Sequence, residues 1–144
     1  MKKQAILLSV VLALSASATL PVAADNSANN SYTNPIERTS LPDPTIIKAD
    51  DGYYYLYATE SIRNLPIYKS KNLVDWAYVG TAFTPETRPQ MVPKGGLWAP
   101  DINRIGSKYV LYYAKSQWGG EWSCGIGVAT ADQPQGPFTD HGKL

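Results

Sequence analysis

A repeated order of four short β-strand patterns is the feature that most constrains the fold of this 144-residue chain. The segment that begins at Pro42-Asp43 is matched, 58 positions later, by the segment that begins at Pro100-Asp101. In each segment a turn with a glycine leads into a tyrosine-rich strand and then into two further strands. The strands are expected at 45–47, 53–59, 67–70 and 76–80, and again at 102–105, 109–114, 125–129 and 137–142. Four strands per repeat are typical of a β-propeller blade, whereas a sandwich has no reason to repeat its strand order.

The number of repeats predicts an incomplete domain. Propellers contain about four to eight blades, and stacked repeats need roughly three or more units for stability. Two such units fit into this chain. We therefore expect an all-β propeller of which residues 35–144 form the N-terminal part, preceded by a disordered polar leader at 25–34.

The N-terminus has the pattern of a secretory signal peptide. A basic head, Met1-Lys2-Lys3, precedes an apolar stretch at 6–20 and small residues at 22–24. A membrane anchor is the alternative, but the apolar stretch is shorter than the ~20 residues that a spanning helix needs. We expect residues 1–24 to be cleaved and the protein to be secreted or periplasmic in a bacterium. Without Lys2 and Lys3 the chain carries 11 basic and 12 acidic side chains, which argues against nucleic acid or a membrane surface as a partner.

Cysteine and histidine are too scarce for several kinds of site. The chain has one cysteine, Cys124, so a disulfide framework and a cysteine zinc site are excluded. It has one histidine, His141, so a histidine cluster is excluded and a Ser-His-Asp triad would depend on that single residue. We expect His141 in a surface loop and Cys124 buried as a small apolar residue. No cofactor is expected.

Two aspartates and a tryptophan form the candidate site. The innermost strands of propeller blades line the central channel, and the repeat places Asp43 and Asp101 at matching strand starts, so both are expected at one mouth of that channel. A carboxylate there must be hydrated, hydrogen-bonded or functional. Trp98, three residues before Asp101, offers a flat apolar face to a sugar ring. The alternatives are that Asp43 caps a turn and that Trp98 packs between blades.

A pair of tryptophans extends the candidate site. Trp118 and Trp122 lie on either side of Gly119-Gly120, in a loop between the second and third strands of the second unit. Exposed tryptophans are an uncommon use of apolar surface and favour a binding rim. For most of the tyrosines, by contrast, the preference of aromatic residues for strands is a sufficient explanation.

Five motifs occur together in one order, and together they resemble the start of glycoside hydrolase family 43. The resemblance covers residues 35–144, and each motif alone is weak. The motifs are Leu41-Pro42-Asp43-Pro44-Thr45-Ile46-Ile47, Asp51-Gly52-Tyr53-Tyr54-Tyr55-Leu56-Tyr57-Ala58, Ser70-Lys71-Asn72-Leu73-Val74-Asp75-Trp76, Leu97-Trp98-Ala99-Pro100-Asp101-Ile102 and Ile126-Gly127-Val128-Ala129-Thr130.

The resemblance implies a five-bladed propeller that inverts configuration with three carboxylates. Asp43 matches the general base of the family. Asp101 does not match the third carboxylate, which in relatives starts the next blade, so Asp101 and Trp98 carry over as substrate-binding residues. Trp118 is added as a substrate-binding residue from its place in the tryptophan loop. The third carboxylate and the general-acid glutamate are expected beyond Leu144. Some relatives hold a metal ion at the propeller axis, but its ligand is not in this stretch.

The resemblance also implies the substrate. We expect a glycosidase that cleaves α-1,5-arabinan or arabinose side chains, with an oligosaccharide or polysaccharide as its partner. Residues 25–144 alone are expected to be inactive and poorly folded. A β-xylosidase of the same family is one alternative. A second is a retaining furanosidase of the related fructan-acting propellers, and a third is a carbohydrate-binding propeller without catalysis.

Overall fold

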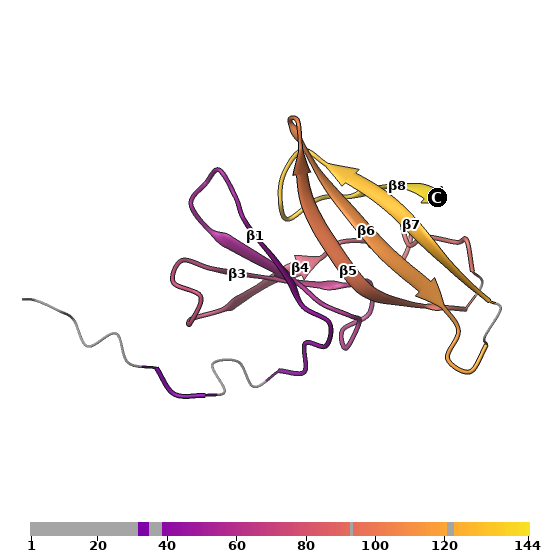
Figure 1. Cartoon of the computed structure of the whole chain (residues 1–144), viewed down its shortest axis with the longest axis horizontal. Coiled ribbons are helices and arrows are strands. Elements are labelled where there is room, and N and C mark those ends of the chain that lie inside the picture. The colour runs from indigo at the N-terminus through magenta and orange to yellow at the C-terminus, as the bar shows by residue number, and fades with distance from the viewer. Residues whose placement is uncertain (1–31, 35–38, 93, 121–122) are drawn as a thin grey trace, which may run out of the picture. The chain divides into compact units, whose positions relative to one another are not determined.

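The computed structural model describes residues 32–34, 39–92, 94–120 and 123–144. These residues form eight strands and no helix (Figure 1). The predicted signal peptide, and all of the predicted leader except 32–34, lie outside the described residues. In the described part of the chain, no helix is long and apolar enough to cross a membrane.

The strands form two four-stranded antiparallel sheets in which every strand pairs with its neighbour in sequence. The first sheet contains β1 (Thr45–Lys48), β2 (Tyr54–Tyr57), β3 (Pro66–Ser70) and β4 (Ala77–Thr81). The second contains β5 (Gly96–Ile105), β6 (Lys108–Ser116), β7 (Cys124–Ala131) and β8 (Thr139–Lys143). The predicted repeat of four strands in the same order is therefore confirmed, and each sheet has the strand content of a propeller blade.

The two sheets match at a spacing of 56 residues rather than the predicted 58. Asp43 and Ala99 both have a positive φ, 49° and 42°, and each directly precedes a proline. Thr45 pairs with Tyr57 of β2 and Asp101 pairs with Tyr112 of β6, so the first strands match at 56 residues and their pairing partners at 55. Asp43 therefore corresponds to Ala99 and not to Asp101. The sequence repeat follows the aspartate, whereas the shared structural feature is the strained residue before the proline.

β5 begins six residues earlier than predicted, and it contains an irregularity that explains the altered spacing. Gly96, Leu97 and Trp98 pair with β6, and pairing resumes at Asp101 after a register shift. Ala99 and Pro100 lie within this shift, which has the features of a β-bulge. The bulge changes the direction of β5 directly after Trp98.

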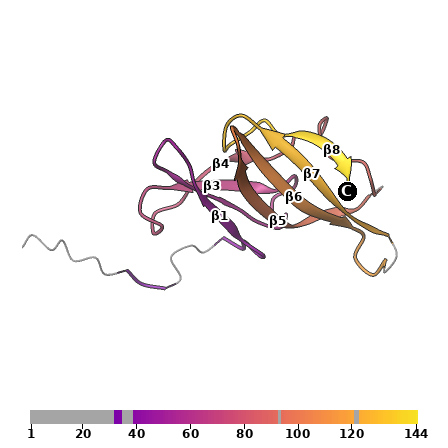
Figure 2. The ribbon, with the colours of Figure 1, turned by 45° about the horizontal axis from the view of Figure 1, so that its top comes forward.

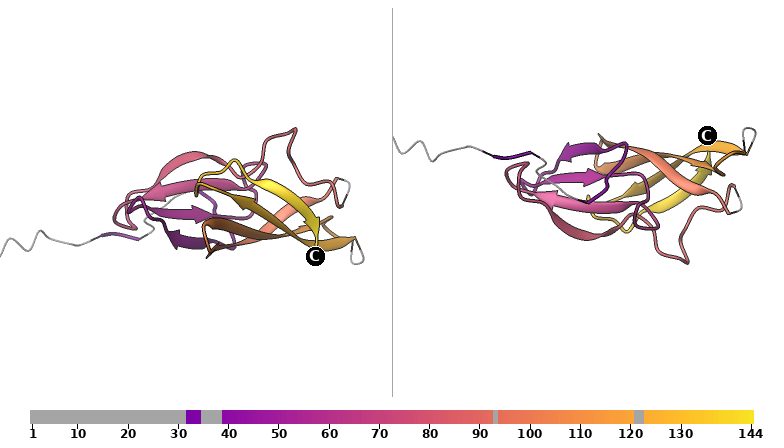
Figure 3. Two further views of the ribbon diagram at one scale, coloured as in Figure 1. Left: turned by 90° about the horizontal axis from the view of Figure 1, so that it is seen from above. Right: turned by 90° about the horizontal axis from the view of Figure 1, so that it is seen from below.

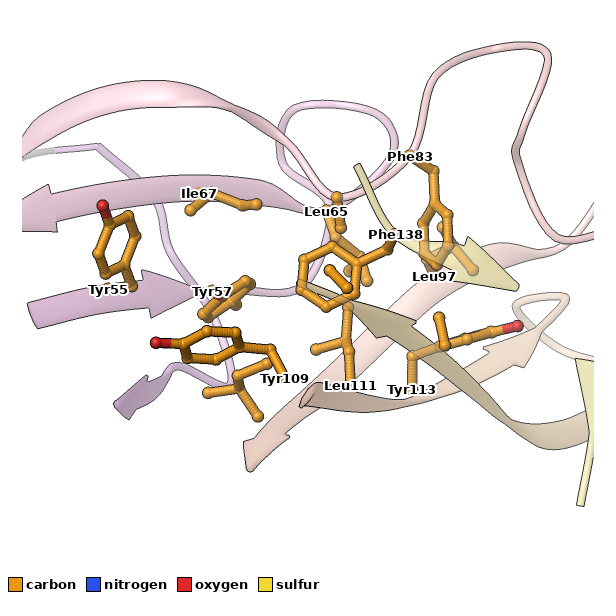
Figure 4. Packing of buried hydrophobic residues seen from close by; sticks show 14 of the residues in the cluster. Tyr55, Tyr57, Leu65, Ile67, Phe83, Leu97, Tyr109, Leu111, Tyr113 and Phe138 are labelled. Carbon is orange, nitrogen blue, oxygen red and sulfur yellow. The ribbon is translucent and has the colours of Figure 1, made fainter. Parts of the chain in front are cut away.

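The main hydrophobic core lies between the two sheets (Figure 4). Its aromatic side chains meet edge to face, with ring centroids 6.1 Å apart for Tyr57 and Phe138 and 5.5 Å for Phe83 and Tyr113. Two of the core tyrosines also donate hydrogen bonds through their hydroxyl groups, Tyr57 to the Pro134 carbonyl and Tyr113 to Asp140. The tyrosines therefore serve as strand and core residues, as the sequence predicts.

The two sheets are separate layers whose strands run obliquely to each other (Figure 2). The connection from β4 to β5 projects beyond the strands (Figure 3). At the turn end of the sheets, Arg104 pairs with Asp50 at 3.1 Å, so the β5–β6 turn touches the β1–β2 turn. The opposite end holds Asp43, Trp98 and Trp118.

A buried ion pair between Glu60 and Arg88 fastens the two sheets at that opposite end. The guanidinium donates to both Glu60 oxygens at 2.7 Å, and it also donates to Asn64 Oδ1 and to the Gly95 carbonyl. The Glu60 carboxylate accepts the backbone N–H of Leu97 at 2.9 Å. Burial by itself raises the pKa of a carboxyl, but Arg88 and two backbone N–H groups outweigh it, and the pKa of Glu60 is lowered.

A buried lysine anchors the same connection from the second sheet. Lys115 of β6 is 2% exposed, and its ammonium donates to the Pro89 carbonyl, next to Arg88. Burial and the charge of Arg88 lower the pKa of Lys115. Arg88 therefore ties the β4–β5 connection to the beginning of β5, and Lys115 ties it to β6.

Replacing Arg88 by Met should leave the Glu60 carboxylate buried without its partner. We expect the free energy of unfolding to fall by ~3–5 kcal/mol, measured by urea denaturation with tryptophan fluorescence as the signal. Lys108→Met, which removes the exposed pair with Asp132, is the control and should cost less than ~1 kcal/mol. Equal losses in the two variants would contradict this role of the ion pair.

Candidate active site

Asp43 presents an exposed carboxylate at the edge of the first sheet, two residues before β1. Its Oδ2 accepts a hydrogen bond of 2.7 Å from the Thr59 hydroxyl. The backbone N–H of Thr59 donates to the Pro42 carbonyl at 2.9 Å. Asp43 is thus held by the residues that follow β2. Because a non-glycine residue rarely adopts a positive φ, these contacts also maintain a strained backbone.

Thr59 and Glu60, two consecutive residues after β2, form hydrogen bonds with the backbone on both sides of Trp98. The Ala99 N–H donates to Thr59 Oγ1 at 2.7 Å. The Glu60 N–H donates to the Leu97 carbonyl at 3.2 Å, and the Leu97 N–H returns to Glu60 Oε1 at 2.9 Å. Trp98, which lies between Leu97 and Ala99, is therefore fixed relative to Asp43 by a short series of hydrogen bonds.

The rings of Trp98 and Trp118 contact each other next to these hydrogen bonds. Their ring centroids are 5.8 Å apart with an interplanar angle of 31°. The Trp98 indole N–H donates to the Ser116 carbonyl at 3.3 Å. Gly96 lies under the indole, since a Cβ atom there would be 2.8 Å from Trp98 Nε1. Trp98 is half-buried, so the packing alternative applies to part of its surface.

Trp118 is 86% exposed, and it lies in the β6–β7 loop next to a cavity. A shallow cavity of ≈ 280 Å³ beside it is lined by Ser116, Gln117, Trp118, Gly119, Gly120 and Cys124. Trp122, the other predicted aromatic residue of this loop, lies outside the described residues. We call Trp98 and Trp118 the tryptophan platform from here on.

Asp101 does not share the environment of Asp43. It is an exposed residue of β5, where its Oδ2 accepts a hydrogen bond of 3.0 Å from Asn103 Nδ2. The predicted matching position therefore needs correction, because the bulge puts Ala99 where the repeat suggested Asp101. Its proposed contact with substrate does not depend on that match and stays a prediction.

Two further expectations meet different outcomes. Cys124, predicted to be buried, is exposed, because it is the first residue of β7, directly after the β6–β7 loop. His141 is exposed as expected but lies in β8, where its Nε2 contacts Thr130 Oγ1 at 2.8 Å. Across the described ranges, no group of three or more Asp, Glu, His or Cys side chains could hold a metal ion.

Thr59, Glu60 and Arg88 support the site although no sequence pattern identified them. Glu60 and Arg88 are 28 positions apart, and Thr59 and Ala99 are 40 positions apart. No local spacing rule links residues at such separations. The sequence offers one weak signal for this support, which is that Glu60 closely follows the buried strand β2 although acidic residues are rare in the core.

The charge state of Glu60 limits what this site can do chemically. A general acid near neutral pH needs a raised pKa, whereas Arg88 holds the pKa of Glu60 below its ordinary value. Glu60 is therefore an ion-pair partner and not a proton donor. Asp43 differs from Glu60, because its carboxylate is exposed and its Oδ2 accepts one hydrogen bond from Thr59.

The sequence profile described as glycosyl hydrolases family 43 matches residues 32–144. A non-reducing end α-L-arabinofuranosidase of Bacteroides ovatus is 36% identical over 119 residues, which are 78% of this chain and 22% of that protein. A xylan 1,3-β-xylosidase of Vibrio sp. is 30% identical over 114 residues, covering 74% of this chain and 21% of the relative.

A solved structure has the same fold over most of the chain. The α-L-arabinanase of Cellvibrio cellulosa, in complex with arabinohexaose, superposes with a TM-score of 0.64 at 29% identity. The match covers 75% of this chain and 36% of the arabinanase. This chain thus spans between about a fifth and about a third of the length of these relatives.

The exposed thiol of Cys124 should react in the folded protein. We expect one equivalent of Ellman's reagent to be consumed per chain without denaturant, because Cys124 is the single cysteine and is open to solvent. Cys124→Ser should give no reaction. A thiol that reacts only after urea is added would show that the loop covers Cys124 in solution.

Proposed function

Since the chain belongs to the glycosyl hydrolases of family 43, we propose that it is part of an enzyme that hydrolyses glycosidic bonds of arabinan or of arabinose-containing polysaccharide. The observation that carries the proposal is the Asp43 carboxylate, held by Thr59 next to the tryptophan platform. The names of the relatives support the substrate class, because they include an arabinofuranosidase and an arabinanase bound to arabinohexaose.

Asp43 is the general base in this proposal. Its carboxylate takes a proton from a water molecule while the water oxygen bonds to the anomeric carbon of the sugar. The glycosidic bond breaks, and in this proposal a general-acid glutamate gives its proton to the leaving oxygen. Because water enters opposite the leaving group, the configuration inverts, and the two carboxyl groups must be ~6.5–9.5 Å apart to admit it.

The tryptophan platform binds the sugar in this scheme. A furanose or pyranose ring presents a face of C–H groups, which packs on an aromatic plane, while its hydroxyl groups project to the rim. Trp98 and Trp118 supply the plane. Asp101 is a substrate-binding residue whose free carboxylate oxygen can accept a sugar hydroxyl.

The remaining expectations become proposals about the complete protein. We propose that the two sheets are the first two blades of a five-bladed propeller, as the fraction of the relatives that the chain spans supports. The third carboxylate and the general acid then come from later blades. Residues 1–24 act as a cleavable signal and residues 25–34 as a leader. The enzyme is secreted or periplasmic, and its acid–base hydrolysis needs no cofactor.

A β-xylosidase is the second candidate, because the Vibrio relative carries that activity in its name. A propeller that binds carbohydrate without catalysis is the alternative from another class. It would keep the tryptophan platform but would not need the Asp43 carboxylate. The substrates to compare are therefore debranched arabinan, arabinoxylan and xylo-oligosaccharides.

Replacing Asp43 by Asn in the complete protein should remove the base but keep the shape of the side chain. We expect kcat on arabinan to fall by ~10²–10⁴-fold, while arabino-oligosaccharide binding, measured by calorimetry, stays within about threefold. Asp75→Asn, on the exposed β3–β4 turn, is the matched control and should leave kcat unchanged. Persistent turnover in Asp43→Asn would mean that another group is the base.

The anomer of the first product tests the mechanism. We expect proton NMR of the complete enzyme acting on arabinan to show the inverted anomer before mutarotation, because a water bound by Asp43 attacks directly. A retained anomer would assign a nucleophilic role to a carboxylate, as in the fructan-acting propellers, and would end the inverting proposal.

A further inference from the structure

We propose that Thr59 is the positioning residue for Asp43 and couples that carboxylate to the tryptophan platform. This inference rests on the proposed role of Asp43 as the general base. It adds a residue whose hydroxyl contacts the base on one side and the backbone next to Trp98 on the other.

The direction of the two hydrogen bonds follows from the donors and acceptors present. A threonine hydroxyl has one proton to donate and two lone pairs. The Ala99 N–H can only donate, so at 2.7 Å it occupies a lone pair of Thr59 Oγ1. An ionised Asp43 can only accept, so the hydroxyl proton points to Oδ2, also at 2.7 Å. The Thr59 hydroxyl therefore accepts from Ala99 and donates to Asp43.

The surroundings of Thr59 hold this arrangement in place. Thr59 is 4% exposed, whereas the carboxylate that it contacts lies at the surface. Its N–H is bonded to the Pro42 carbonyl, and the adjacent Glu60 is locked by Arg88. A β-branched side chain has few χ1 rotamers. A rigid buried group thus orients an exposed carboxylate that would otherwise sample several rotamers.

The consequence for the reaction is geometric. Thr59 binds Oδ2, which leaves Oδ1 as the oxygen for the attacking water. The same hydroxyl accepts the N–H of Ala99, the residue that follows Trp98 and, like Asp43, has a positive φ. A sugar ring resting on Trp98 is therefore at a fixed position relative to Oδ1. Catalysis is sensitive to such placement, since a misplacement of about 1 Å can cost ~10²-fold in rate.

The test compares Thr59→Val, Thr59→Ser and Thr45→Val in the complete enzyme. Val keeps the branched shape and loses the hydroxyl, and Ser restores the hydroxyl. Thr45 is a matched control, because its Oγ1 also accepts a backbone N–H from β5, that of Ile102 at 3.5 Å, but does not contact Asp43. Initial rates on arabinan give kcat and KM, and hydrogen exchange reports opening at the Ala99 amide.

For Thr59→Val we expect kcat to fall ~10–100-fold with KM changed less than about threefold, and exchange at Ala99 to accelerate. Thr59→Ser should regain most of the lost kcat, and Thr45→Val should keep the kcat of the unmodified enzyme. A kcat in Thr59→Val equal to that of the unmodified enzyme, with Asp43→Asn inactive, would overturn the positioning role alone. An active Asp43→Asn would instead overturn the proposed function.

Discussion

The buried pair of Glu60 and Arg88 is the interaction on which the arrangement of the two sheets depends. Hydrophobic contact holds the sheets together, but it is non-directional and tolerates sliding of one layer over the other. The bidentate pair at 2.7 Å removes that freedom, because Glu60 also bonds the backbone of Leu97 and Arg88 also bonds the carbonyl of Gly95. Both anchors lie at the beginning of β5, the strand that carries Trp98.

The cost of burying a charge explains why so many partners surround the pair. An ion pair away from water is favourable only when the remaining lone pairs and protons are also satisfied. Here Asn64 and two backbone groups complete the set, and no buried side-chain polar atom of the described residues lacks a partner. The lowered pKa of Glu60 is the electrostatic result. The ion pair that stabilises the sheet contact therefore disfavours Glu60 as a proton donor near neutral pH.

Two strained residues lie at equivalent places in the two sheets, Asp43 and Ala99. Each non-glycine residue in the left-handed region costs of the order of 1–3 kcal/mol unless its surroundings hold it there. One hydroxyl, that of Thr59, bonds to both residues. The strain and its support thus meet at the end of the sheets where the tryptophan platform lies, while the turn end is held by the exposed pair of Arg104 and Asp50.

Local patterns in the sequence determined the strands, their order, the repeat and the aromatic candidates, because alternation and turn residues act over a few positions. They also brought Asp43, Trp98 and Trp118 into one hypothesis, and the hydrogen bonds and ring contact of the structure place these three at one end of the sheets. Tertiary structure alone decided the spacing of 56 residues, the separation of Asp101 from Asp43, the exposure of Cys124 and the hydrogen bonds of Thr59 and Glu60. The spacing and the place of Asp101 depend on a bulge register, the exposure of Cys124 on where β7 begins, and the contacts of Thr59 and Glu60 on residues as many as 40 positions apart. Such contacts form only when two sheets pack, so no short segment encodes them by itself.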